Sequence, residues 1–535
     1  RAEAAVMELL QTYPKPSQKE LDAAKASIEY GWKETMESTR GMASEINEAI
    51  SRGDAFDVYN RFRILRKVTA DDIVRVAKAT FNVDRSTVGW FLPGEQHELL
   101  PEPEYSPPKY SVAPSIDSLR APSSTQVKLE EVTKTSETTA FTKYNSAKTH
   151  IRISLQSPSS TYNAYETMAR HMLADLMTKG VKIKQQDFSE QKIQAFLDTN
   201  GIERHVSTSP YGINITVSIP SNDSKVVGRM ISLLKSEMTN PTLNSDTFDY
   251  LQKKTGAELM GSSGNVNNMA GVLMSQALFE DGSCNYVHTS EELKTALFDL
   301  GHSSIVEEHQ KLLNGTMKLS VLSSSDEILD MCKKLTTRDN TYTPMVDHVL
   351  IKEPLKSATI DYKIPGKTSC TVRWGHVIDK PSIATKIAIG ALGNGFAGRL
   401  MKIVRDKMGL TYGIYARQTR QHGAHVFDVT ATFAPANLER GIRESEKVMN
   451  EWKNGVTNEE IDIQKQMLIG SQIVSWDNPA VISATVHSCL LQDKSMATVD
   501  DFKKKVESVS YAAVRRALKT QLEPKRLKRV TVGTF

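Results

Sequence analysis

Cysteine is scarce in this sequence, and the four residues present lie far apart. Cys284, Cys332, Cys370 and Cys489 form no Cys-x-x-Cys pair, which argues against a zinc knuckle and against a disulfide scaffold. Long apolar runs are absent too, because none approaches the roughly 18 residues that a membrane-spanning helix needs. The net charge is only +4, and no long basic run indicates nucleic acid as a partner.

The motifs of several enzyme classes are also missing. The glycine-rich segment 390–398 has no Lys-Ser/Thr ending and no preceding strand, so it is neither a P-loop nor a dinucleotide fingerprint. Close helix packing and room for a substrate backbone are its two interpretations. No Ser-His-Asp or Cys-His arrangement is recognised. His487 and Cys489 are two residues apart on a predicted helix, and residues at that spacing do not face each other.

What the sequence does contain is one helical block in three copies. The blocks begin at Ser17, Asn244 and Thr457, and each has an apolar residue four positions later, then an Asp. Each continues as a long amphipathic helix and a second helix. The period is a little over 200 residues, too long for a solenoid, so it indicates duplicated domains. Almost nothing precedes the first block, and we therefore expect the chain to start inside a domain.

Four segments are predicted along the chain. Residues 1–98 are helices followed by a strand at 86–92, and residues 99–125 are a proline-rich linker, which favours an extended conformation. Residues 126–350 and 355–535 each predict a strand, a helix, a hairpin, the repeat block, further helices and a final strand. The predicted fold class is α+β, with helices packed on one face of mostly antiparallel sheets.

Apolar periodicity locates the main elements inside the two complete copies. Alternation over 149–157 predicts a half-buried strand, and a helix is expected from about 162 to 178. A hairpin is predicted within 202–219. In the last copy, a strand at 369–375 precedes two helices and a hairpin at 411–433.

His171 and Asp175 form the first candidate site. They stand at i and i+4 on one helix face, the spacing with which helical zinc motifs direct two ligands at one metal. Zinc hydrolases also need a general base about one turn away, whereas position 174 is Ala174. One His and one Asp make a poor metal site. The competing interpretation is an ordinary helix that carries a His and an Asp.

Arg405 and Tyr412 form the second candidate site. A helix is predicted to end near Met408 with Gly409 as its C-cap, and Tyr412 begins the next strand. Both side chains can face one cavity, where their donors would stabilise the oxyanion formed from a peptide carbonyl. The alternative is that the Arg is favoured by the helix dipole and that the Tyr packs on the sheet.

These residues and repeats resemble the M16 metallopeptidase family, which includes pitrilysin, insulysin and mitochondrial processing peptidase, over essentially the whole chain. The segment His171-Met172-Leu173-Ala174-Asp175 stands where the catalytic domain of that family has His-x-x-Glu-His. The resemblance therefore implies a non-catalytic third domain with a degenerate zinc motif, which Glu258 does not restore. Arg405 and Tyr412 match the Arg/Tyr pair that the fourth domain of the family lends to the active site.

The resemblance implies duplicated LuxS/MPP-like domains and the C-terminal, non-zinc half of an M16-type endopeptidase. Residues 1–98 would be the end of a second domain, 126–350 a third and 355–535 a fourth. Zn²⁺ and the general base are expected on an N-terminal half, a separate or cleaved polypeptide, so this chain alone is expected to be inactive. Its substrates would be unfolded or short peptides. The alternative is an inactive M16-like core subunit of a respiratory or processing complex.

Overall fold

The computed structural model describes residues 2–12, 14–54, 56–81, 86–89, 132–134, 138–157, 162–184, 186–220, 223–262, 264–336, 348–352, 358–495, 501–523 and 526–535. The chain forms two units, one of residues 1–32 and 43–129, the other of 33–42 and 130–535. The predicted linker at 99–125 lies outside the described residues. None of the described helices combines the length and the apolar character that crossing a bilayer requires.

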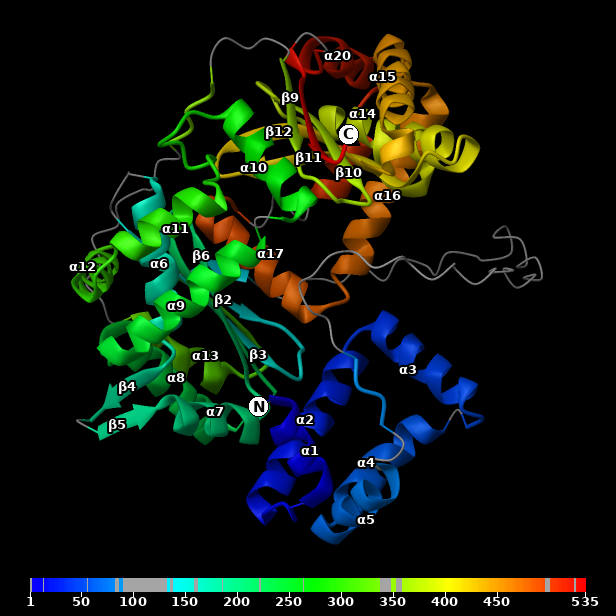
Figure 1. Cartoon of the computed structure of the whole chain (residues 1–535). Helices are drawn as coiled ribbons and strands as arrows, with labels where there is room; N and C mark the ends of the chain where they lie inside the picture. Colours follow the sequence, from blue (N-terminus) through cyan, green and yellow to red (C-terminus); the bar gives the residue numbers. More distant parts are fainter. Residues whose placement is uncertain are drawn as a thin grey trace. The chain divides into compact units, whose positions relative to one another are not determined.

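Residues 2–80 form five helices (Figure 1), which are α1 Ala2–Thr12, α2 Gln18–Met36, α3 Thr39–Ser51, α4 Asp57–Lys67 and α5 Ala70–Thr80. Thr69 caps α5: its hydroxyl accepts from the backbone N–H of Asp72, whose carboxylate accepts from Thr69 N–H. The guanidinium of Arg61 lies 4.9 Å from the ring centroid of Trp32 and pairs with Glu45 at 2.5 Å. These contacts fasten α4 to α2 and α3.

The strand predicted at 86–92 is not found in its described part. Residues 86–89 belong to no strand, and 90–92 lie outside the described residues. A strand needs a neighbouring strand for its backbone hydrogen bonds, and the described residues before 132 contain no strand. Composition alone favoured a strand there, but the described residues 86–89 do not form one.

A six-stranded sheet organises residues 132–336, in the order β1-β2-β8-β3-β7-β6. Only β2 and β8 run parallel; the other neighbours are antiparallel. Its strands are β1 Val132–Lys134, β2 Thr139–Lys143, β3 Thr149–Gln156, β6 Glu203–Ser209, β7 Gly212–Ile219 and β8 Thr316–Ser323. The helices and a small β4–β5 hairpin are α6 Ala164–Leu176, β4 Gly180–Ile183, β5 Gln186–Ser189, α7 Glu190–Thr199, α8 Ser224–Thr239, α9 Ser245–Ser262, α10 Val266–Leu278, α11 Ser290–Asp299, α12 His302–Leu313, α13 Asp326–Cys332 and η3 Lys333–Thr336.

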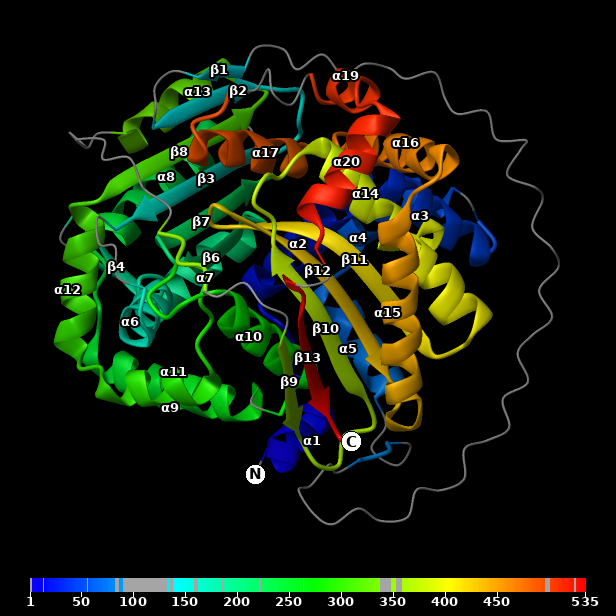
Figure 2. The same cartoon turned by 90° about the horizontal axis from the view of Figure 1, so that it is seen from above.

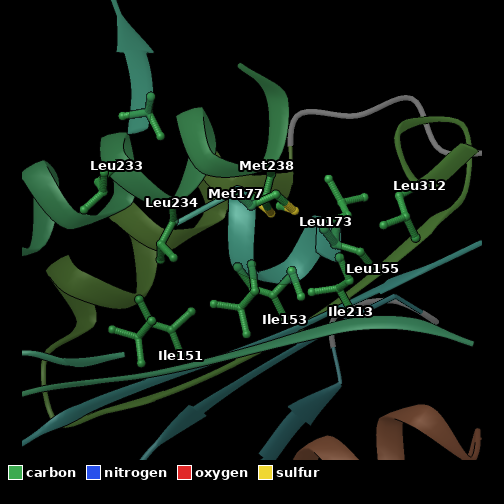
Figure 3. Packing of buried hydrophobic residues seen from close by; sticks show 14 of the residues in the cluster. Ile151, Ile153, Leu155, Leu173, Met177, Ile213, Leu233, Leu234, Met238 and Leu312 are labelled. Atoms are coloured by element: carbon green, nitrogen blue, oxygen red, sulfur yellow. The ribbon is translucent and has the colours of Figure 1, made fainter. Parts of the chain in front are cut away.

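The core of this domain lies between one face of the sheet and its own helices. Ile151, Ile153 and Leu155 on β3 point to the side where Leu173 of α6 and Leu234 of α8 pack (Figure 3), and all five are at most 2% exposed. Burying one such side chain contributes about 1.5–3 kcal/mol. Alternate residues of a strand point to the same face of its sheet, so these three β3 side chains all reach the core.

A five-stranded sheet organises residues 358–535, in the order β11-β12-β10-β13-β9. Here β9 and β13 are the parallel pair. Its strands are β9 Ala358–Lys363, β10 Cys370–Val377, β11 Thr411–Gln421, β12 Ala424–Phe433 and β13 Lys528–Gly533. The helices are α14 Ile383–Gly393, η4 Gly395–Ala397, η5 Met401–Lys407, η6 Pro435–Asn437, α15 Leu438–Asn454, α16 Asn458–Ser475, α17 Pro479–Leu491, α19 Phe502–Glu507 and α20 Tyr511–Gln521.

The two sheets exchange a helix. Helix α10 is the second helix of the second repeat block, yet it packs on β10 and β13 of the five-stranded sheet. Helix α17, the second helix of the third block, packs on β3 and β8 of the six-stranded sheet (Figure 2). The α+β class is confirmed, and each sheet is covered on both faces. For this reason β3, predicted to be half-buried, is buried on both sides: Ser154 is only 2% exposed.

Each repeat block starts at the predicted capping residue. Ser17 exchanges hydrogen bonds with Glu20, Asn244 accepts from the backbone of Thr247, and Thr457 forms a capping box with Glu460. The apolar residues four positions after the caps are buried, and they are Leu21, Phe248 and Ile461. A side-chain cap satisfies backbone N–H groups that the first helical turn leaves unpaired, so the three helices begin at equivalent positions.

Candidate functional site

Arg405 lies in the last turn of a π-helix, η5, not of an α-helix. The backbone N–H of Met408 donates to the carbonyl of Ile403, five residues earlier, and Leu410 N–H donates to Val404. Gly409 takes φ +64°, the left-handed conformation that glycine adopts without strain, which confirms the predicted turn. π-helical turns recur at functional sites. Here the π-helical hydrogen bonds of the backbone determine where the Arg405 side chain leaves the helix.

Tyr412 stands at an irregularity at the start of β11. The register of β11 against β12 shifts between Thr411 and Ile414. The Thr411 hydroxyl fixes this bulge, since it donates to the carbonyl of Thr432 at 2.5 Å and accepts from Gly413 N–H at 3.1 Å. A bulge re-aims side chains out of the regular alternation. The result is that Tyr412 is 90% exposed.

The structure brings Arg405 and Tyr412 together and adds Phe396. The guanidinium carbon of Arg405 lies 5.6 Å from the ring centroid of Tyr412 and 5.3 Å from that of Phe396. Each exposed cation–π contact of this kind stabilises the position of the arginine by about 0.5–1 kcal/mol. The Phe396 ring is 68% exposed. Sequence reasoning included it only as part of the glycine-rich turn and gave it no role.

Asp406 balances part of the charge of Arg405. Its carboxylate accepts from Nη1 of Arg405 at 2.8 Å, and the two side chains are 48% and 30% exposed. No other hydrogen bond to the guanidinium, and none to the Tyr412 hydroxyl, is formed among the described residues. The remaining guanidinium donors and the phenol O–H are therefore available to an incoming carbonyl oxygen.

The glycine-rich turn that carries Phe396 is tightly packed. A Cβ on Gly393 would lie 2.3 Å from the backbone nitrogen of Ala416 in β11, and one on Gly398 would lie 2.6 Å from the Cα of Gly393. Of the two interpretations of segment 390–398, close packing is the one supported. The packing also positions Phe396 beside Arg405, because it fixes the path from α14 to η5.

His171 and Asp175 lie on α6 and are both partly buried. Ala174 between them is 4% exposed and belongs to the apolar core. Glu258 is on α9, where its carboxylate lies 3.7 Å from Lys254 and is 61% exposed. One imidazole and one carboxylate fall short of the three protein ligands that catalytic zinc requires, and no group of three His, Cys, Asp or Glu suited to a metal occurs within the described residues. These residues do not fit zinc.

A buried polar cluster under α17 was not foreseen. The two ring nitrogens of His487 are each 2.9 Å from a serine hydroxyl, Nε2 from Ser154 and Nδ1 from Ser320. Arg152 reaches the carbonyl of Ala480 on the same helix. Burial first, and then the nearby cations Arg152 and Lys318, lower the pKa of His487 to about 3. The cluster joins the helix to the sheet, and its two serines are only 2% exposed.

Comparisons with known proteins agree with this fold. Residues 326–468 match the family model described as "Peptidase M16 inactive domain". The "Non-peptidase homolog YmxG" of Helicobacter pylori is 21% identical over 314 residues, which cover 56% of this chain and 69% of that protein.

Solved structures extend the likeness. The peptidase M16 inactive domain from Pseudomonas fluorescens superimposes with a TM-score of 0.65 at 17% identity and covers 76% of this chain and 98% of its own. The periplasmic protease PqqL from Escherichia coli gives a TM-score of 0.60 at 13% identity over 99% of this chain and 63% of its own. The predicted resemblance to the non-catalytic half of an M16 fold is confirmed.

Proposed function

We propose that this chain is the non-zinc half of a peptidase, because residues 326–468 match the M16 inactive-domain model and the fold resembles that of such domains, and that Arg405 and Tyr412 contact the substrate backbone. The observation that carries the proposal is the pairing of an exposed phenol with a guanidinium that two aromatic rings hold in place. Neither side chain needs its donors for the fold. Tyr412 is 90% exposed and the Arg405 side chain is 30% exposed, and both are carried by regular elements, as a substrate-binding pair requires.

The chemistry follows from the donors of the pair. When a peptide carbonyl becomes tetrahedral, its oxygen gains negative charge, and preorganised donors stabilise that charge more than they stabilise the ground state. Removing one such donor costs about 10²–10³ in kcat. Asp406 accepts from Nη1 of Arg405, which leaves the other N–H groups of the guanidinium for a carbonyl oxygen.

On this proposal the chain alone is inactive, and its partner is an N-terminal half that carries zinc and a general base. The substrates are unfolded or short peptides enclosed between the halves. The match to a family model of an inactive domain supports the division of labour. The donor set at His171 and Asp175 supports it too, since these residues cannot replace a zinc site.

A second candidate is a structural subunit without peptidase activity. It is favoured by the likeness to a protein named as a non-peptidase homolog. In that case Arg405 and Tyr412 would have no catalytic consequence, and the assembled complex would not cleave peptides.

The test is a comparison of kcat/KM for a quenched fluorescent peptide, with this chain combined with its N-terminal half. Tyr412→Phe removes only the hydroxyl, and we expect kcat/KM to fall about 10²–10³-fold; Arg405→Ala should lower it at least as much. Tyr415→Phe, on the same strand, and Lys407→Ala, in the same helix, are the matched controls and should leave it unchanged. Equal activity of Tyr412→Phe, Arg405→Ala and the wild-type would refute the proposal. A complex without activity would favour the structural candidate.

A further inference from the structure

A cavity of about 450 Å³ opens in the C-terminal domain, between the sheet and α15. This volume lies within the range of small-molecule sites, roughly 300–1,000 Å³. Aromatic rings border it from the strands and charged groups border it from α15 and β13: Trp374, His376, Phe427, Glu446, Lys453 and Arg529. None of these residues takes part in the Arg405–Tyr412 site.

The charges around the cavity come as two opposite pairs. Glu446 accepts from Arg529 Nη1 at 3.2 Å and from the indole N–H of Trp374 at 3.1 Å. Lys453 borders the same space with Glu523; burial lowers the pKa of Lys453, and the charge of Glu523 opposes that shift. Two acids and two bases sum to no net charge. A phosphate would meet both carboxylates, so multiply charged anions are disfavoured.

Two polar atoms at the cavity lack partners. His376 is 2% exposed, and its Nδ1–H donates to the carbonyl of Val377 at 2.9 Å, which leaves Nε2 as a bare acceptor. Neither that Nε2 nor the Nε–H of Arg529 has a hydrogen-bond partner among the described residues. Buried polar atoms are nearly always paired. A ligand could therefore donate a hydrogen bond to Nε2 of His376 and accept one from the Nε–H of Arg529.

We propose that this cavity binds a small zwitterion with an apolar side chain, namely a free amino acid or a dipeptide. Its ammonium group donates toward Glu446 and His376, its carboxylate accepts from Arg529 and Lys453, and its side chain lies against Trp374 and Phe427. The charge pattern selects a molecule that carries both signs, and the aromatic wall selects an apolar body. The site does not depend on the proposed peptidase role.

The test is isothermal titration calorimetry of the full 535-residue chain with three leucine-based probes and with inorganic phosphate. L-leucine and L-leucyl-L-leucine separate the two sizes of ligand, and N-acetyl-L-leucinamide has the same side chain without either charge. We expect at least one zwitterion to bind with Kd of about 1 mM or tighter, and the neutral analogue to bind at least about tenfold more weakly.

Variants on one helix provide the control. Lys453→Met and Glu446→Gln should each weaken binding about tenfold or more, whereas Lys447→Met, an exposed lysine of α15 outside the cavity, should match the wild-type. Thermal melting of each variant shows that it is folded. His376→Phe tests the acceptor separately, so an unfolded Glu446→Gln protein does not end the experiment. No binding by either zwitterion, equal binding of the neutral analogue, or tighter binding of inorganic phosphate would each overturn the proposal.

Discussion

Lowering the pH should destabilise the unit of residues 130–535 through His487, and His487→Gln should remove this effect. The imidazole is neutral in the folded protein: Ser154 donates to Asn214 and therefore accepts from Nε2–H, which leaves Nδ1 to accept from Ser320. The buried ring also lies near the cations Arg152 and Lys318. A second proton would be both unsolvated and repelled.

The sign and size follow from the pKa of the ring. It is about 3 in the folded state against an ordinary value of 6.5, so only the unfolded chain takes up the proton in that interval. Stability is therefore complete above pH 6.5 and is lost as the pH falls toward 3, at about 1.4 kcal/mol per pH unit. Between pH 7 and pH 5 the loss through this residue is about 2 kcal/mol.

Urea unfolding followed by tryptophan fluorescence at pH 7, 6 and 5 measures the loss. Each protein is compared with its own value at pH 7, so the fixed cost of replacing His487 cancels. His376, whose pKa burial lowers to about 4, destabilises wild-type and His487→Gln alike and also cancels. The wild-type should lose about 2 kcal/mol more than the variant by pH 5. Parallel losses in the two proteins would refute the assigned environment of His487.

Two further predictions concern packing near the candidate motifs. Arg170→Met should destabilise the protein by about 3 kcal/mol, because Glu308, at 2% side-chain exposure, loses its 3.0 Å partner and keeps the more exposed Lys311 at 3.5 Å. The double variant with Glu308→Leu should recover most of this in the same urea assay. Gly393→Ala should cost about 1–3 kcal/mol and lower the melting temperature, since its Cβ would meet the backbone of β11. Gly470→Ala, with open space around its Cβ, is the helical control and should not lower it; equal melting temperatures would contradict the tight packing.

The sequence predicted helix starts and turns well where a single residue determines them. Ser17, Asn244 and Thr457 were identified as caps because their side chains bond to the adjacent backbone, a contact within four residues. Gly409 was identified because only glycine takes its conformation easily. In both cases the determinant and the structure lie in the same turn, so no knowledge of distant contacts was needed.

Long-range contacts were beyond the same reasoning. Ser154 alternates with apolar neighbours and therefore indicated a solvated face, but a helix from more than 300 residues away in the chain covers it. Similarly, spacing placed Arg405 and Tyr412 on either side of a turn, yet the stacking on Phe396 and the exposure of Tyr412 depend on the bulge at Thr411. The predicted strand at 86–92 had suitable residues, but its described part, 86–89, does not form a strand.

The helix exchange makes the two sheets interdependent in folding. Helix α17 covers polar groups of β3 and β8, and α10 covers apolar groups of β10 and β13. If the sheets separated, one face of each sheet would be exposed to water. The exchanged helix on each side would be exposed as well, so a single separation would destabilise both sheets. We therefore expect them to melt in a single cooperative transition. The same constraint would act on the evolution of the two duplicated domains. A substitution in α10 or α17 has to fit the sheet of the other domain.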